Sequence, residues 1–303
     1  MHKACPYCGG ITKKYFSAHD INQRISELEF IYYRCNECGL IFLDPIPNNI
    51  QDYYGQEYPA YRKIEDIKKE ATDYDFGKIA IINKYAQGKR LLEIGPGSGT
   101  FAYLAQQEGY VVDVIEMDSN CCKFLEESIK IQKVVNSNDV VGALGQLEGG
   151  YDVIVMWHVL EHLKDPWNVL RSLPNVLAPN GVVMIAVPNP DALQFKLLKK
   201  YWKHVDAPRH VVLLPMRFMM REMNELGLEK ILVSTNDQVS RIFNTYDWLL
   251  YSLNNFIAEN PNSFVSKMMK KKRVTQWVYH KLVGRFQRVE GNGNAFLAIY
   301  KKN

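Results

Sequence analysis

The sequence predicts an α/β fold built on a mainly parallel sheet, preceded by a small cysteine-containing module. Two observations lead to this prediction. From about residue 66 to residue 235, short apolar runs alternate with amphipathic segments of helical length, as in consecutive β-α-β units. Before that stretch, two Cys-x-x-Cys-Gly motifs lie within the first 44 residues. The chain of 303 residues is therefore expected to divide into a module at 1–44, a connector rich in Pro and Tyr at 45–65, and a large domain at 66–303.

The apolar runs define the expected elements of the large domain. Strands are expected at 90–94, 110–116, 133–135, 152–157, 182–187, 230–233 and 295–300. Helices are expected at 98–108, 119–130, 166–177 and 216–226. An aromatic and basic segment of helical pattern interrupts the alternation at 236–292. The strand that follows it is expected to run antiparallel to the others.

Composition narrows the class of protein. A hydrophobic content of 47% is ordinary for a chain that buries a full core, and a formal net charge of +4 does not indicate a dedicated nucleic-acid binder. The N-terminus lacks the apolar stretch of a secretion signal, and the chain has no run of about 18 apolar residues. We therefore expect a cytoplasmic protein with reduced thiols.

A glycine-rich turn follows the strand expected at 90–94. Gly95, Gly97 and Gly99 allow a tight turn, and the helix that begins after them offers free N–H groups to a ligand. A dinucleotide fingerprint would require its third glycine at position 100, which is Thr100. The spacing therefore disfavours a pyrophosphate ligand and an NAD-linked oxidoreductase.

An acidic residue, Glu116, ends the next strand, about 20 residues beyond the turn. A carboxylate at this place can accept both hydroxyl protons of a ribose. It indicates an adenosine-containing ligand, and alone it does not choose between a nucleotide and an adenosylmethionine.

Four segments in order resemble class I S-adenosylmethionine-dependent methyltransferases, over residues 66–303. They are the loop Glu93–Gly99, the acid Glu116, the stretch Tyr151–Leu163 that contains Leu160-Glu161-His162, and the turn Leu177–Val182 with the Val187-Pro188-Asn189 that follows. In that turn Asn180 stands where the family has glycine. The resemblance implies a Rossmann-like fold that binds S-adenosylmethionine.

The resemblance also implies a set of cofactor-binding residues. Trp157 and His158 would lie near the methyl group, although core packing is the alternative role for Trp157. Asn138 and Asp139 follow the third strand, where the family contacts adenine. The expected cofactor-binding set is Glu93, Gly95, Pro96, Gly97, Gly99, Glu116, Met117, Asn138, Trp157 and His158.

The two cysteine motifs are expected to bind a structural zinc ion. Four thiolates on two tight turns can close a tetrahedral site, and a closed set of ligands leaves no open position for catalysis. The ligands would be Cys5, Cys8, Cys35 and Cys38. Disulfides or free thiols are the alternative. A zinc-binding module fused to this kind of domain resembles sugar C-methyltransferases and related enzymes of polysaccharide and secondary-metabolite synthesis.

Candidate acid–base residues are concentrated after the fifth strand of the large domain. His210 is favoured as the general base, with His204, Asp206 and Arg209 positioning the acceptor. His158 and His162 are alternative bases, and a loop held together by salt bridges is the alternative role for the whole segment. Tyr58 and Tyr61 of the connector either fold over the acceptor or simply pack.

The sequence thus predicts an S-adenosylmethionine-dependent methyltransferase of a small-molecule acceptor, a sugar or related precursor, acting by O- or C-methylation. An RNA base methyltransferase is disfavoured, because five basic residues in 1–44 are balanced by five acidic ones. A non-catalytic cofactor-binding protein is the other alternative. Segment 236–292 is interpreted as a wall of the substrate pocket, with contact to an anionic membrane as its alternative.

Overall fold

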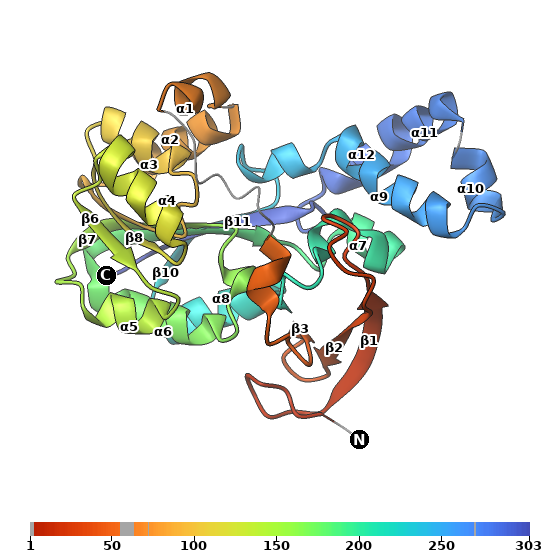
Figure 1. Ribbon diagram of the computed structural model, residues 1–303, viewed down its shortest axis with the longest axis horizontal. Helices are drawn as coiled ribbons and strands as arrows, with labels where there is room; N and C mark the ends of the chain where they lie inside the picture. Colours follow the sequence, from red (N-terminus) through yellow and green to blue (C-terminus); the bar gives the residue numbers. More distant parts are fainter. Residues whose placement is uncertain (1–2, 55–63, 72, 270) are drawn as a thin grey trace.

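Two sheets organise the molecule (Figure 1). The computed structural model describes residues 3–54, 64–71, 73–269 and 271–303. The larger sheet has seven strands in the order β10-β11-β8-β7-β4-β5-β6, and the smaller has four in the order β1-β2-β3-β9. The strands of the larger sheet are β4 (Arg90–Ile94), β5 (Val111–Glu116), β6 (Lys133–Asn136), β7 (Tyr151–Trp157), β8 (Leu177–Pro188), β10 (Glu229–Ser234) and β11 (Ala295–Lys301).

The strand directions confirm the predicted fold class. The pairs β4–β5, β4–β7, β5–β6 and β7–β8 are parallel, whereas β11 runs antiparallel to both of its neighbours, β8 and β10. Chain order reverses direction across the sheet at β4, since β5 and β6 lie on one side of it and β7 on the other. In open α/β sheets, ligands bind at such a reversal, beyond the carboxyl ends of the strands.

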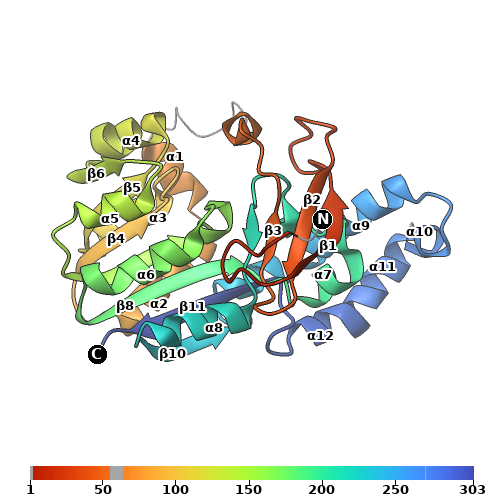
Figure 2. The same ribbon diagram turned by 90° about the horizontal axis from the view of Figure 1, so that it is seen from below.

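Helices cover both faces of the seven-stranded sheet (Figures 1 and 2). One face carries α2 (Asp73–Tyr85), α3 (Thr100–Gln107) and α4 (Ser119–Phe124), and the other carries α5 (Val140–Gly145), α6 (Pro166–Val176) and α8 (Met216–Glu225). Successive strand residues point to opposite faces, so Leu91 belongs to one apolar cluster and Leu92 to the other. These two clusters form the core.

The remaining helices connect or extend this body. They are α1 (Ile64–Glu70), α7 (Leu193–Leu198), α9 (Tyr246–Glu259), α10 (Phe264–Met269), α11 (Lys272–Val278) and α12 (Gly284–Gln287). Short 3-10 turns are η1 (Ile50–Tyr54), η3 (Leu160–His162), η4 (Lys199–Tyr201), η5 (Lys203–Val205) and η6 (Ser240–Phe243), and π-helical turns are η2 (Leu125–Ile129) and η7 (Tyr279–Val283).

Most element boundaries agree with the sequence pattern. The expected strands match to within one residue, except that β8 begins earlier, at Leu177. The β7–β8 register shifts between Tyr151 and Val153, and Asn180 on β8 has a φ of +62°, so the expected turn lies inside that strand. The apolar periodicity did not predict α1, α2, α5, α7 or the two-residue strand β9.

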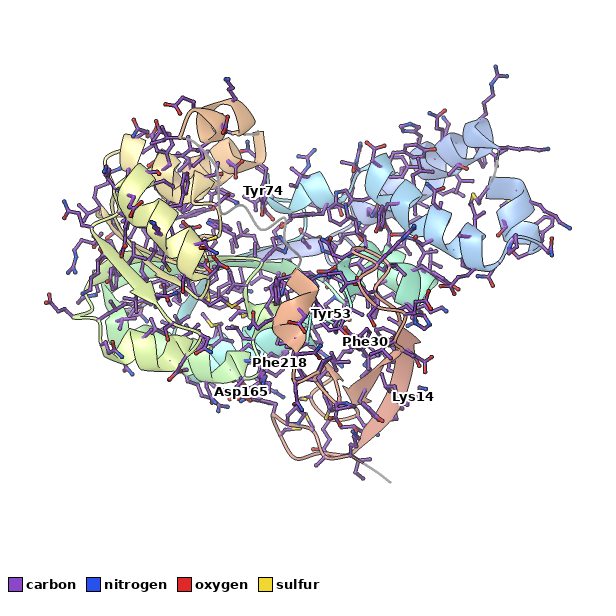
Figure 3. All side chains as sticks on the ribbon, viewed as in Figure 1. Lys14, Phe30, Tyr53, Tyr74, Asp165 and Phe218 are labelled. Carbon is purple, nitrogen blue, oxygen red and sulfur yellow. The ribbon has the colours of Figure 1, made fainter. Side chains whose placement is uncertain are left out.

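The N-terminal module shares its sheet with the large domain. Its strands are β1 (Thr12–Ala18), β2 (Phe30–Cys35) and β3 (Ile41–Leu43), and β3 pairs with β9 (Val212–Leu213). A single apolar cluster runs from the module into the large domain. Figure 3 shows three aromatic residues at this junction, Phe30, Tyr53 and Phe218, all of them buried.

Candidate functional site

The glycine loop joins β4 to α3 at the carboxyl end of the sheet. Gly95 N donates to Ile115 O at 2.9 Å, which ties the loop to β5. The φ of Gly95 is +70°, and a Cβ there would lie 2.7 Å from Val159 Cγ2. Gly97 also has a positive φ, +54°, but a Cβ there would meet nothing within 4 Å. The loop is thus packed at Gly95 and faces open space at Gly97.

Glu116 holds the end of β5 against this loop. Its buried carboxylate accepts hydrogen bonds from Gly97 N at 3.0 Å, Met117 N at 2.8 Å and Asp118 N at 2.9 Å. An ionised carboxylate offers about four acceptor positions, so it retains capacity for a further donor. The sequence-predicted ribose acid therefore lies next to the glycine loop.

A cavity of about 900 Å³ lies beyond the carboxyl ends of β4, β5 and β7. Its size is within the range of small-molecule sites. The predicted cofactor residues that line it are Gly95, Glu116, Met117, Asn138 and His158. The connector contributes a wall through Asn48, Ile50, Gln51 and Tyr54, and α6 begins at the cavity after Asp165 (Figure 3). Tyr58 and Tyr61 lie outside the described residues.

Glu93 and Trp157 lie in the interior of the domain, together with a lysine that sequence reasoning missed. The Lys78 ammonium is buried 3.4 Å from Asp75 Oδ1 and 5.5 Å from the Trp157 ring centre. Burial raises the pKa of Glu93 to about 8, although the positive charge of Lys78 acts in the other direction and lowers it. Trp157 packs edge-on against Phe101, with centroids 5.4 Å apart, so it has the core contacts that were the alternative role for it. A lone lysine on a helix gives no sequence signal of burial.

Glu161 is the centre of a cluster of histidines. Its Oε1 lies 3.2 Å from His158 Nδ1 and 4.0 Å from His210 Nε2, on a carboxyl group that is 1% exposed. Its Oε2 is buried with no hydrogen-bond partner among the described residues. The His158 backbone has a φ of +59°, and a strained non-glycine residue of this kind is characteristic of functional sites. The sequence motif contained Glu161 but assigned it no role.

The charge state of this cluster follows from its burial. Burial, and after it the charge of His210, lowers the pKa of His162 to about 4. Burial alone would raise the pKa of Glu161, but the hydrogen bond from His158 and the charges of the histidines lower it below its ordinary value. At neutral pH, His162 is therefore neutral and Glu161 is ionised. One possible ligand atom each from Glu161, His162 and His210 lies within 4.8 Å of the others. A carboxylate and two imidazoles at this spacing could also hold a metal ion.

The ring of His210, the base favoured by the sequence, is oriented by a hydrogen bond to a backbone carbonyl. Its Nδ1 lies 2.8 Å from His204 O and so donates to that carbonyl. Its Nε2 then faces Asp206 Oδ2 at 3.8 Å and Glu161. His158 and His162 line the cavity, whereas the buried His210 contacts His162 edge-on with ring centroids 4.7 Å apart.

Arg209 links three parts of the chain. Its buried guanidinium donates to Asp20 of the N-terminal module at 3.2 Å, to Tyr53 O of the connector at 2.8 Å, and to Asp206 Oδ2 at 3.0 Å. Burial opposes ionisation of Asp206, but the hydrogen bond from Arg209 and the charge of His210 hold the pKa of that carboxyl well below its usual range. Arg209 and Asp206 thus form the salt-bridged loop that was the alternative to acceptor positioning.

His204 is enclosed by aromatic rings. It stacks on Trp248 of α9 with centroids 4.5 Å apart and lies 5.0 Å from Trp202. Burial lowers its pKa well below the ordinary value for histidine, so its ring is neutral. Helix α9, from the segment 236–292, therefore packs directly on the histidine-rich segment.

The four cysteines of the N-terminal module converge on one point. Their sulfur atoms lie within 4.8 Å of one another, with Cys5–Cys38 at 3.6 Å and Cys8–Cys35 at 3.5 Å. Zinc–sulfur bonds of about 2.3 Å in a tetrahedron place sulfurs roughly 3.8 Å apart. Disulfide sulfurs would be about 2.05 Å apart. The spacing therefore fits a tetrahedral metal ion and excludes disulfides within this set.

Comparisons with known proteins agree with this architecture. A family model described as "Methyltransferase domain" matches residues 67–233, more than half of the chain. Among solved structures, an S-adenosylmethionine-dependent methyltransferase from Archaeoglobus fulgidus has a TM-score of 0.52 and 17% identity, over 79% of this chain and 98% of that one. At that identity the likeness shows the fold alone.

Curated relatives match a shorter stretch. A protein named ubiquinone biosynthesis O-methyltransferase from Vibrio campbellii (strain ATCC BAA-1116) is 30% identical over 107 residues, covering 34% of this chain and 45% of the relative. One of the same name from Xanthomonas campestris pv. campestris (strain B100) is 25% identical over 130 residues, covering 41% and 52%. The chain thus spans about half the length of the curated relatives it matches.

Proposed function

The chain belongs to the methyltransferase-domain family, and on that premise we propose that it transfers a methyl group from S-adenosylmethionine to a small-molecule acceptor. One observation carries the proposal. Gly95 of the glycine loop and Glu116 both line a cavity at the point where chain order reverses across the sheet, beside His158, whereas Pro96, Gly97 and Gly99 do not line it.

Each part of the cavity has a proposed role in holding the cofactor. The Glu116 carboxylate accepts a ribose hydroxyl at the acceptor position that its three backbone hydrogen bonds leave free. Met117 and Asn138 flank the adenine, since both line the cavity beyond β5 and β6. The cofactor supplies an electrophilic methyl group on a sulfonium leaving group.

We propose His158 as the group that removes the proton of the acceptor. When Nδ1 donates to Glu161, a neutral imidazole keeps its lone pair on Nε2, and that atom is buried with no protein partner among the described residues. Nε2 would take the proton of the acceptor hydroxyl as that oxygen receives the methyl group, and the electrons of the broken carbon–sulfur bond would remain on the sulfur of the cofactor. His210 remains the alternative base, on the other side of Glu161.

The acceptor is proposed to react through a hydroxyl group. The names of the curated relatives support O-methylation, and a histidine oriented by a carboxylate suits a hydroxyl proton. The resemblance of the cysteine module to that of sugar C-methyltransferases supports a sugar or a related polysaccharide or secondary-metabolite precursor as the acceptor.

We further propose that four cysteines of the N-terminal module hold a structural zinc ion. They are Cys5, Cys8, Cys35 and Cys38.

Calorimetric titration with S-adenosylmethionine tests the shared premise. We expect saturable binding to the native protein and a loss of about tenfold or more in affinity for Glu116→Gln, because a charged acceptor of ligand hydrogen bonds is removed. Asp113→Asn is the matched control, since its carboxylate lies on the same strand and accepts from Tyr151 Oη at 2.7 Å. A folded native protein that shows no binding at millimolar cofactor would contradict the proposal.

A further inference from the structure

Residues 264–289, here called the arm, comprise α10, α11, η7 and α12. Figures 1 and 2 both show these helices to one side of the seven-stranded sheet, on the same side as α9. The arm contains eight Lys and Arg residues and no Asp or Glu. The whole chain, by contrast, has 37 basic and 33 acidic residues, so positive charge is concentrated in this segment.

Large apolar side chains of the arm are exposed. Trp277 is 58% exposed, Leu282 47%, Phe286 55% and Val289 53%, and Phe264 of α10 reaches 79%. A π-helical turn closes hydrogen bonds five residues apart, so the step from Trp277 to Leu282 across η7 returns to nearly the same face. Steps of four and three residues then reach Phe286 and Val289. Trp277, Leu282 and Phe286 therefore form one apolar stripe, which Val289 continues just past the end of α12, while Phe264 is exposed on the separate helix α10.

Basic residues run beside that stripe. Lys281, Arg285 and Arg288 are exposed, and each precedes a member of the apolar stripe by one residue. On a helix this offset places the charged stripe next to the apolar one, and long basic side chains can reach past apolar groups to solvent. An amphipathic helix with Trp, Phe and Leu on one side and Lys and Arg beside them suits the interface of a bilayer with anionic lipids.

We propose that the arm docks this protein onto the surface of an anionic lipid bilayer. An acidic nucleic acid would pair with the charges but would leave the apolar stripe in water, whereas a bilayer interface accommodates both. The proposed contact is peripheral. Among the described residues, no helix combines the length and the apolar character of a membrane span. The inference does not depend on the proposed methyl transfer.

The arm is linked to the cavity through α9. Trp248 of α9 stacks on His204, and Phe243, just before α9, lies 4.7 Å from the ring of His158. Docking of the arm would therefore hold α9, and with it the histidine cluster, near the membrane surface.

Sedimentation of the full-length protein with vesicles tests the proposal. We expect binding to vesicles of phosphatidylglycerol mixed with phosphatidylcholine, weakening as salt rises, and much less binding to phosphatidylcholine alone. Replacing Trp277 and Phe286 together by Ser, or Lys281 and Arg285 together by Glu, is expected to lower partitioning by roughly tenfold or more.

Matched controls separate docking from general surface effects. Phe76→Ser on α2 removes an aromatic ring that is 53% exposed, and Lys123→Glu reverses an exposed charge on α4. Both should bind vesicles like the native protein. Circular dichroism and the S-adenosylmethionine titration show that each variant is folded. Equal binding to both vesicle types, no binding to either, or arm variants that bind like the native protein would overturn the proposal. Retention on duplex DNA without vesicle binding, or self-association that requires Phe286, would do the same.

Discussion

His158 and His210 lie on either side of one buried carboxylate, and they differ in what their second nitrogen meets. His158 Nε2 has no protein partner among the described residues, whereas His210 Nε2 faces two carboxylates. We therefore expect His158→Ala to lower methyl transfer by about 100-fold or more, with cofactor affinity retained. Transfer of tritium from labelled S-adenosylmethionine to a panel of nucleotide sugars and phenols measures this.

The comparison of variants identifies the base. His210→Ala should have the smaller effect, because it removes a neighbour of Glu161 and not the proton acceptor. His280→Ala, at an exposed position of the arm, is the control and should leave transfer unchanged. A larger loss in His210→Ala than in His158→Ala would reverse the assignment in favour of the sequence-based choice.

Single residues differ in how far the sequence can predict them. Gly95 and Glu116 are predictable, because a tight turn and a ribose demand those residue types at that spacing. Lys78 is not, because its burial depends on Glu93 from another element and on the ring of Trp157. The same holds for Arg209, whose partner Asp20 is far away in sequence.

At the level of elements, Arg209 couples the N-terminal module, the connector and the loop after β8. Its side chain is 5% exposed and its partner Asp20 is fully buried. Arg209→Ala leaves Asp20 and Asp206 without their cation, so we expect a loss of about 3–5 kcal/mol in the free energy of unfolding. Denaturant titration followed by circular dichroism measures this loss.

An exposed ion pair provides the comparison for that variant. Lys123 and Glu127 lie 4.0 Å apart with side chains 69% and 65% exposed, so Lys123→Ala should cost less than about 1 kcal/mol. Similar costs for the two variants would mean that the Arg209 network contributes no more than a surface pair.

Elements with a strong apolar period were predictable, and those defined by long-range pairing were not. β4, β5 and β7 are buried on both faces and read as continuous apolar runs. β9 is only two residues long, and its strand geometry exists because β3 lies beside it. The end of the expected helix 119–130 becomes the π-helical turn η2, a change of hydrogen bonding that apolar spacing does not reveal.

At the scale of the whole molecule, the proposed zinc site should stabilise the large domain as well as the N-terminal module that carries it. The sheet shared through β9 and the common apolar cluster join the module to the large domain. We expect one zinc ion per chain by elemental analysis. Cys35→Ser should lose that ion and lower the midpoint of a single thermal transition, because metal binding contributes to folding free energy.

A cysteine outside the cluster serves as the control. Cys121 is buried on α4, and Cys121→Ser should keep its zinc. If Cys35→Ser retained full zinc, the assignment of the ligands would be wrong. If it lost zinc and melted unchanged, the ion would have no structural role.

The pairing of β3 with β9 also has a consequence during synthesis. The ribosome releases β3 about 170 residues before β9, which at roughly 5–20 residues per second is a delay on the order of ten to thirty seconds. Over that interval the nascent module has an unpaired strand edge, the kind of surface that recruits other strands. The cysteine pairs flank β1 and β2, so early capture of a metal ion would hold these strands together until their last partner emerges.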